Sequence, residues 1–507
     1  MKSAGWCIGL ALAIMPASAA AQRLDPQPLD SELPALKLLT RSNIQTSPTQ
    51  RLVLIDQALA MLAQPTPFRG AMLCARAQVL RFLTRYDEAR ASLEQCRQLL
   101  PDDPRVIVES AFDEAEERRP VEAAKLLIRA AQLGPDAVRK IPPSSMGMVL
   151  RPLRYAQADK MLDDLMASLA ASGWGRNNPE VFAEVAIPVV RHMIADGRRA
   201  DALAMLPSIL SPRAGLAMLI DRRYAQIRPQ VEAWAGPDLS VQRQALLAGT
   251  RAAYQTSRSP DDFLAYTAAL SQTGHRDQAI SELRTWLVAP PAQINPWYRN
   301  AVVVSFGNFL GETGKREEGI ARMKAALGGP DASDRSVANI VPNLVIQMLM
   351  ARDYVGALGV LDARTPDASG VEAPPALGYF IALRACALTG AGRKDEADRD
   401  LLRVQTVYAA NDDAVKMAVG CMATPDVQAA LWIKRADNDE TRTNALVELA
   451  TAQARATKNM PIASLDEAAL RQIAARADVA AVYDRLGQAL PASYVPALLE
   501  FEGVPNT

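Results

Sequence analysis

Histidine, cysteine and aromatic residues are scarce in this chain. Of its 507 residues only 2 are histidine and 5 are cysteine, and aromatic side chains make up 5%. So few histidines, together with the lack of a C-x-x-C pair, leave little from which to build a zinc site. Strands draw on aromatic and β-branched side chains, whereas this chain relies on Ala, Leu and Arg, which favour closely packed helices. The composition therefore predicts an all-α protein without a metal or cofactor.

An excess of charge of either sign is also missing. The chain carries 56 basic and 56 acidic residues and no basic block, so nucleic acid is not an expected partner. Beyond the N-terminus, no apolar run approaches the ~20 residues that a membrane-spanning helix needs. We therefore expect no membrane span in the mature chain, whereas binding of a glycan or lipid stays open.

The first 21 residues have the features of a signal peptide. Lys2 supplies the positive start, WCIGLALAIM an apolar run, and ASAAAQ the small residues that suit cleavage. We expect cleavage after Ala21, with Ala19 as the alternative, and a protein exported to the periplasm.

Export favours disulfide bonds among the cysteines that remain after cleavage. Cys74 and Cys96 lie 22 residues apart, and Cys386 and Cys421 lie 35 residues apart. Each bond would stabilise the fold by ~3–4 kcal/mol through loop closure. Two disulfides are the sharper interpretation, and four buried thiols remain the alternative.

An interval of 34 residues recurs early in the chain. The pairs at this interval are Ala77 and Ala111, Ala89 and Ala123, Leu93 and Leu127, Cys96 and Ala130, and Pro101 and Pro135. Small side chains at two of these positions indicate where two antiparallel helices approach closely. Leu and Cys at helical spacing point into a core, proline ends the second helix, and Asp102 and Asp103 are placed to cap the next one.

This pattern resembles the tetratricopeptide repeat family, most strongly from Ala71 to Pro135. Later segments match it at intervals of 38 to 40 residues, through Ala279, Leu283, Trp286 and Pro291, through Gly307, Gly319, Met323 and Ala326, and through Ala357, Leu361, Ala397, Leu401 and Val404. The resemblance implies a superhelical solenoid of antiparallel helix pairs.

The strength of the repeat predicts the domain organisation. After the signal peptide (1–21) we expect a linker or capping segment (22–50), an N-terminal array (51–140), divergent helical hairpins (141–260), a C-terminal array (261–420) and a helical C-terminal cap (421–507). The segment IPPSS at 141–145 is a candidate joint between two arrays, and Ser464 and Glu467 have the spacing of a capping box.

One short motif points to catalysis. The residues ESAF at 109–112 resemble the start of the active-site helix of lytic transglycosylases, in which the Glu is a general acid on peptidoglycan. The Gly-rich segment that shapes the sugar cleft in those enzymes does not follow, and a lone carboxylate lacks the surroundings that raise its pKa for acid work. The repeat explains the same letters, so we assign Glu109 to the scaffold and expect no catalytic residue.

The resemblance to tetratricopeptide proteins also implies a function. Their first helices line a concave groove that holds a peptide or another protein, and the corresponding groove candidates here are Gln78, Arg81, Phe82, Arg105, Phe112, Glu116, Asn308, Glu312 and Tyr379. We therefore expect a non-catalytic periplasmic scaffold that binds other envelope proteins, in polysaccharide export or envelope assembly. The alternative is a peptidoglycan-processing enzyme with an α-superhelical body.

Overall fold

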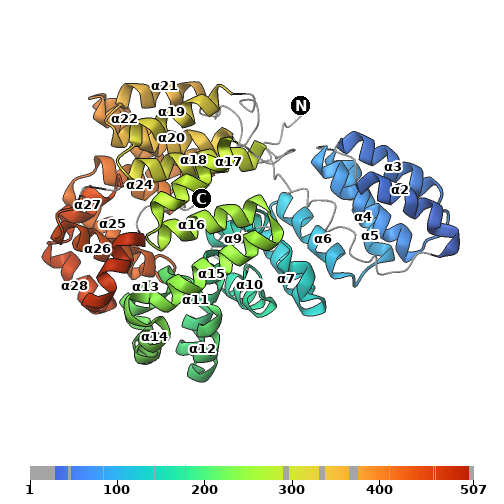
Figure 1. The fold of residues 1–507 in the computed structure, drawn as a ribbon, viewed down its shortest axis with the longest axis horizontal. Helices are drawn as coiled ribbons and strands as arrows, with labels where there is room; N and C mark the ends of the chain where they lie inside the picture. The colour runs from blue at the N-terminus through green and yellow to red at the C-terminus, as the bar shows by residue number, and fades with distance from the viewer. Residues whose placement is uncertain are drawn as a thin grey trace. The chain divides into compact units, whose positions relative to one another are not determined.

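A computed structural model describes residues 29–501, except residues 44–46, 84, 142, 157, 177, 289–295, 330–336, 365–374, 410, 461 and 463. The predicted signal peptide and Pro291 therefore lie outside the described residues. Over the described part, the chain forms α-helices joined by short turns and a few 3-10 helices, and no β-strand (Figure 1). The prediction of an all-α fold is confirmed.

The chain divides into two compact units, which we describe separately. Unit 1 comprises residues 1–176 and 184–189, unit 2 comprises residues 177–183 and 190–507, and the division crosses α11 (Pro179–Ala195). The other helices of unit 1 are η1 (Asp30–Glu32), α2 (Leu33–Asn43), α3 (Pro48–Ala60), α4 (Pro67–Phe82), α5 (Tyr86–Leu99), α6 (Pro104–Glu116), α7 (Pro120–Leu133), α8 (Pro135–Arg139), α9 (Pro143–Tyr155) and α10 (Asp159–Ser172).

Unit 2 continues with the remaining helices of the chain. Its first part contains α12 (Arg199–Met205), η2 (Leu206–Ser208), α13 (Pro212–Ile220), η3 (Arg222–Ile227), α14 (Arg228–Ala235), η4 (Pro237–Leu239), α15 (Ser240–Ser257), α16 (Pro260–Gln272) and α17 (Arg276–Val288). Its middle contains α18 (Pro296–Glu312), α19 (Arg316–Leu327), α20 (Val337–Met350), α21 (Tyr354–Arg364), α22 (Pro375–Gly390) and α23 (Lys394–Val407). Its end contains α24 (Asp412–Met422), α25 (Pro425–Asp437), α26 (Arg442–Thr457), α27 (Glu467–Ile473), α28 (Ala477–Leu486), η5 (Ala492–Tyr494) and α29 (Val495–Phe501).

Many of these helices begin with a polar residue followed by proline. Thr66, Asp103 and Ser259 each accept a hydrogen bond from a free backbone N–H of the following first turn. Proline at the next position suits the helix start because its missing N–H would have no partner there and its φ is already helical. As predicted, Asp103 caps α6; its neighbour Asp102 instead pairs with Arg129 on α7.

The predicted repeat positions form the interface within each helix pair. Ala77, Ala89, Ala111 and Ala123 are all buried, between α4 and α5 and between α6 and α7. In α18 and α19 the equivalent residues are glycines, and a Cβ added to Gly319 would lie 2.5 Å from the carbonyl oxygen of Gly307. The helices of this pair approach so closely that neither alanine nor a larger residue fits at that contact.

In unit 2 each first helix also packs against the next. Contacts join α16 to α18, α18 to α20, α20 to α22 and α22 to α24, as expected for stacked helix pairs. The continuous core around α20 and α22 includes Leu344, Met348, Leu361, Ile381 and Val404. These pairs constitute a helical-repeat array.

The end of unit 2 returns to its beginning. Asp221 and Gly487 form an antiparallel β-bridge, and the backbone N–H of Gln488 donates to the carbonyl oxygen of Ile220 at 2.8 Å. Helix α26 packs against α13, and α29 packs against α16 and α26. The helical array of unit 2 is therefore closed on itself.

One local prediction in the C-terminal region is wrong. Helix α27 begins at Glu467 without a side-chain cap, so Ser464 and Glu467 do not form a capping box. Glu467 is instead buried, and its Oε1 accepts hydrogen bonds from Arg455 at 3.1 Å and from Arg471. A buried carboxylate is stable only with such partners. Arg471 at i+4 could be read from the sequence, whereas Arg455 lies 12 residues earlier, on α26.

Candidate functional site

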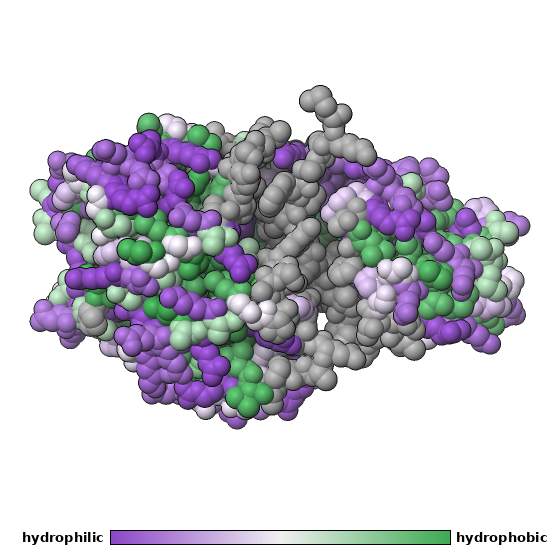
Figure 2. Space-filling model, turned by 90° about the horizontal axis from the view of Figure 1, so that it is seen from above, coloured by the Kyte–Doolittle hydropathy of each residue, from purple (hydrophilic) through white to green (hydrophobic). Residues whose placement is uncertain are grey.

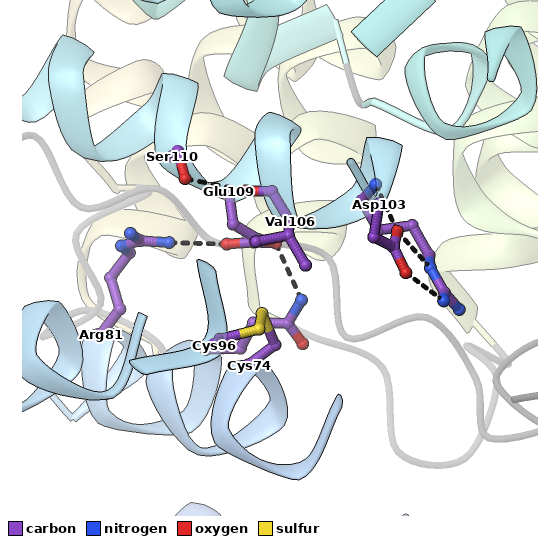
Figure 3. Close-up of a disulfide and its surroundings, with 9 residues drawn as sticks. Cys74, Arg81, Cys96, Asp103, Val106, Glu109 and Ser110 are labelled. Carbon is purple, nitrogen blue, oxygen red and sulfur yellow. Dashed lines mark hydrogen bonds and ion pairs between the residues drawn. A yellow bond between two sulfur atoms is a disulfide. The ribbon is translucent and has the colours of Figure 1, made fainter. Parts of the chain in front are cut away.

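Glu109 lies between two neighbouring first helices of unit 1. Its Oε2 lies 2.7 Å from Arg81 Nη1, and its Oε1 accepts a hydrogen bond from Gln78 Nε2 at 2.8 Å (Figure 3). Arg81 also lies 3.2 Å from Glu116 and 3.8 Å from Asp113. These contacts join α4 to α6, and Glu109 is one link in them.

The electrostatics of this cluster agree with a structural role. Burial lowers the pKa of Arg81, but Glu109 and Glu116 outweigh that effect and raise it above its ordinary value. Burial raises the pKa of Asp113 and of Glu116, against the opposing influence of Arg81. The guanidinium therefore stays charged and holds three carboxylates of α6 against α4.

The groove candidates of unit 1 differ in their contacts and in their burial. Gln78, Arg81 and Glu116 are engaged with each other's helices as described, and Phe112 is only 9% exposed on α6, which also packs against α8 and α9. Arg105 is exposed and pairs with Asp103 in the turn that precedes it. The side chain of Phe82 lies outside the described residues. Gln78 and Arg105 are exposed whereas Arg81 and Phe112 are buried, and a binding groove over these positions remains a prediction.

A different groove of unit 1 lies between two second helices. It has a volume of about 440 Å³, and its lining residues are Glu94, Arg97, Gln98 and Pro101 of α5 and its turn, Val106, Ile107, Ser110 and Glu114 of α6, and Glu122, Lys125, Leu126 and Arg129 of α7. The floor is apolar at Val106 and Ile107, and the walls are charged. We call this the α5–α7 groove.

Four of the charges on the walls of the α5–α7 groove are paired within their own helix. Arg97 lies 3.5 Å from Glu94, Lys125 lies 2.8 Å from Glu122, and all four side chains are about half exposed. Exposed pairs of this kind contribute only ~0–1 kcal/mol. A partner can therefore replace them at little cost. The charge pairs at i and i+3 on α5 and α7 can be read from the sequence. The groove itself cannot, because its depth depends on the distance between α5 and α7.

Asn308, a groove candidate of unit 2, is buried in a chain of amide contacts. Its Nδ2 donates to Asn343 Oδ1 at 3.0 Å, and its Oδ1 accepts from Gln347 Nε2 at 3.2 Å. Arg316 Nε in turn donates to Gln347 Oε1 at 3.1 Å. These bonds connect α18, α19 and α20, so Asn308 serves the packing of the array, which its sequence position did not reveal.

Glu312, one turn further along α18, is a carboxyl group with poor partners. Its Oε2 lies 3.0 Å from Arg276 Nε, but that N–H is directed at Ser271 Oγ, and Glu312 Oε2 is buried without a hydrogen bond to any described residue. Burial raises the pKa of Glu312 to about 8, although Arg276 and Arg455 oppose it. Glu312 is therefore largely protonated at neutral pH.

Tyr379, the last groove candidate, lies beside a partly buried ion-pair network. Burial raises the pKa of Tyr379 to about 12, with Asp413 adding to the effect. In the network, Lys416 Nζ lies 3.0 Å from Glu448 Oε1, and Arg435 Nη1 lies 2.7 Å from Glu448 Oε2. Burial raises the pKa of Glu448, but Lys416 and Arg435 outweigh this and hold it at about 2.

The four cysteines of the described chain form two disulfides. Cys74 and Cys96 join α4 to α5 within one helix pair, with Cα atoms 5.6 Å apart (Figure 3). Cys386 and Cys421 join α22 to α24, two consecutive first helices, with Cα atoms 5.3 Å apart. One bond thus fixes a pair and the other fixes the stacking of one pair on the next.

Outside these clusters, the side chains of interest are the metal-ligating types and the two histidines. Among the described residues, no group of three or more His, Cys, Asp or Glu side chains is arranged to hold a metal ion. His275 is exposed in the turn before α17, and His192 is partly buried on α11. No helix in the described ranges is both long and apolar enough to cross a membrane.

Comparison with known proteins adds few constraints. No protein-family model and no curated protein sequence matches the chain. Among solved structures, the tetratricopeptide domain of P58(IPK) is 12% identical, covers 76% of this chain and 98% of its own, and gives a TM-score of 0.20. Naa15/Naa10 bound to HypK-THB is 12% identical over 94% of this chain and 95% of its own, with a TM-score of 0.22.

A circular tandem repeat protein is similarly distant, at 13% identity over 93% of this chain and 89% of its own, with a TM-score of 0.15. All three TM-scores are low, so the assignment rests on this chain's own helix pairs and on the small buried residues at their contacts. The chain has a tetratricopeptide-like helical-repeat fold. In a tetratricopeptide-like array, function follows from the surfaces between helices and not from the fold itself.

Proposed function

We propose that this chain is a non-catalytic scaffold or adaptor that binds other proteins in a bacterial envelope. The observation that carries the proposal is the α5–α7 groove, whose apolar floor and replaceable surface ion pairs suit a side chain or short segment of a partner. Its volume of about 440 Å³ is within the range of binding pockets, ~300–1,000 Å³.

The setting is inferred from the N-terminal sequence. A signal peptide cleaved after Ala21 would deliver the chain to the periplasm, where its two disulfides would be stable. Polysaccharide export and envelope assembly are the processes we favour. The boundaries at residues 22–50, 51–140, 141–260, 261–420 and 421–507 remain our proposal for the repeat organisation.

The surface chemistry supports contact with proteins. Figure 2 shows polar and apolar residues intermixed over the described parts of one face. Such a surface suits reversible association, in which a few anchor side chains supply most of the binding energy. A glycan or lipid ligand would be an outcome of the test described next.

The test compares two charge-reversed proteins. Tagged mature protein would be cross-linked in intact envelopes, purified and examined by mass spectrometry for bound proteins. The groove variant is Lys125→Glu with Arg129→Glu, on the wall formed by α7. The matched control is Arg154→Glu with Lys160→Glu, which reverses two exposed charges on α9 and α10 of the same unit.

We expect one or a few envelope proteins to be recovered with wild type and the control, and to be lost with the groove variant. Equal recovery with both variants would exclude the α5–α7 groove as the binding surface. Recovery of muropeptides or polysaccharide without protein would contradict the scaffold function. The enzymatic alternative has little support in the site, because Glu109 is held by Arg81 and Gln78.

A further inference from the structure

The segment that closes unit 2, residues 487–500, is bound largely through its own backbone. Arg222 Nε donates to the carbonyl oxygen of Gly487 at 3.0 Å, and Arg228 Nη2 donates to that of Ala489 at 2.8 Å. The N–H of Gln488 donates to the carbonyl oxygen of Ile220. Arginine side chains and a strand-like bridge thus recognise the main chain of this segment, which we call the closing segment.

The second half of the closing segment adds side-chain contacts. Tyr494, Ala497 and Leu498 are buried, with 5%, 0% and 2% of their surfaces exposed. The N–H of Ala497 donates to Asp238 Oδ1 at 3.0 Å, and Arg243 forms an ion pair with the carboxylate of Glu500. The surface that binds the closing segment therefore offers an apolar seat for a short helix. It also offers Arg243 as the partner of an acidic residue at the end of that helix.

This surface has the properties of a peptide-binding site. Recognition through backbone carbonyls makes few demands on sequence, whereas the apolar seat and Arg243 select an aliphatic side chain followed by a carboxylate. Helix α29 has only 7 residues and would not be stable alone, so its position depends on these contacts. A segment held by a few backbone contacts and one short helix opens locally more readily than the centre of a packed array.

We propose that the closing segment occupies a protein-binding surface of unit 2 and is displaced by a partner segment of the same chemistry. The partner would present a short helix with a buried aliphatic residue and an acidic residue after it. This inference rests on the proposed function, because it assumes that the chain binds proteins. It assigns the chain a second binding surface that is occupied by its own C-terminal region until a partner competes.

The test uses a chain that ends after Leu486 and, as the probe, a fluorescent peptide of residues 487–507. We expect the shortened chain to bind the peptide saturably, measured by fluorescence anisotropy. The full-length protein should bind at least about tenfold more weakly, because only its small open fraction has a free surface. A peptide with Leu498→Asp should not bind, whereas Ser493→Asp, at an exposed position, should bind like the parent peptide.

Two variants of the shortened chain identify the surface. Arg243→Ala should weaken binding because it removes the partner of Glu500, while Arg251→Ala, an exposed position on the same helix α15, should not. The inference is overturned if the shortened chain fails to melt cooperatively, since the segment would then be an integral part of the fold. Equal binding by full-length and shortened chains, or binding of the Leu498→Asp peptide, would also overturn it. None of these outcomes involves an envelope partner, so they are distinct from a failure of the proposed function.

Discussion

At the scale of single residues, the position of Glu109 decides between a catalytic and a structural role. A general acid needs a cleft and a proton at neutral pH, whereas Glu109 is only 14% exposed and faces a guanidinium that is 8% exposed. Two more carboxylates, Asp113 and Glu116, share the same arginine. The chemistry around Glu109 is that of a helix-to-helix clamp.

We therefore predict that Glu109→Gln retains biological function but lowers the free energy of unfolding of unit 1 by about 1–2 kcal/mol. The amide keeps the size of the side chain and loses its charge, which weakens the contact to Arg81. Urea denaturation of wild type and variant measures the change, with Asp136→Asn, a 77% exposed position on α8, as the control. Loss of function at unchanged stability would support the enzymatic alternative instead.

Glu312 should make the stability of unit 2 depend on pH, because its carboxyl group holds a proton in the folded protein. Its pKa lies near 8 in the folded protein, above the ordinary value of 4.5, so the folded state binds a proton that the unfolded state releases. The stabilisation linked to this proton is fully present below pH 4.5 and is lost as the pH rises from 4.5 to about 8. A pKa difference of this size corresponds to roughly 3–5 kcal/mol.

The variant Glu312→Gln removes that titration and preserves the shape of the side chain. Between pH 5 and pH 8 the variant should gain stability relative to wild type by a few kcal/mol, measured by urea denaturation at both pH values. A difference between the two proteins that stays constant with pH would show that Glu312 is ionised throughout. Glu318→Gln, 43% exposed on α19, serves as the control.

At the scale of elements, the contact of α18 with α19 sets two general rules against each other. Alanine favours a helix over glycine by ~1 kcal/mol, yet a Cβ on Gly319 would lie 2.5 Å from the carbonyl oxygen of Gly307. Overpacking of this kind costs about 1–3 kcal/mol, so we predict that Gly319→Ala destabilises unit 2.

The control variant is Gly359→Ala in α21. Nothing lies within 4 Å of a Cβ added to the exposed Gly359, so this variant should be stabilising. Thermal unfolding followed by circular dichroism distinguishes the signs, and a stabilising Gly319→Ala would mean that the helices separate easily.

The same contacts show what the sequence could predict. Small residues at a fixed interval predicted the helix pairs correctly, because close approach within a pair depends on residues near each other in the chain. Phe112 and Asn308 were predicted as groove residues, and the sequence did not show that both are buried, with 9% and 4% of their surfaces exposed and Asn308 bound by amides of α20. Such burial depends on the curvature between pairs, which no local pattern records. The α5–α7 groove was missed for the same reason.

At the scale of the whole of unit 2, closure changes how the array should respond to damage. In an open helical-repeat array each pair contacts only its neighbours, so a local perturbation spreads to adjacent pairs alone. Here Asp221, near the start of the unit, is fully buried and bonded to Arg223 at 2.6 Å and to Thr443 Oγ1 at 2.7 Å. Arg223 also donates to the carbonyl oxygen of Asp439 at 3.0 Å.

We therefore predict that Asp221→Asn destabilises both ends of unit 2 together, by about 2–4 kcal/mol, because it removes the buried charge that the partly buried Arg223 pairs with. Amide hydrogen exchange should accelerate in α13 and also in α26. The reason is that Asp221 binds Thr443, which lies on α26 and 222 residues further along the chain. The control is Asp201→Asn on α12, where the half-exposed carboxylate pairs with Arg198 of the same turn, and it should leave both helices unchanged. Faster exchange confined to α13 and its sequence neighbours would mean that the unit behaves as an open array, whereas a joint response of α13 and α26 would make closure part of its cooperative fold.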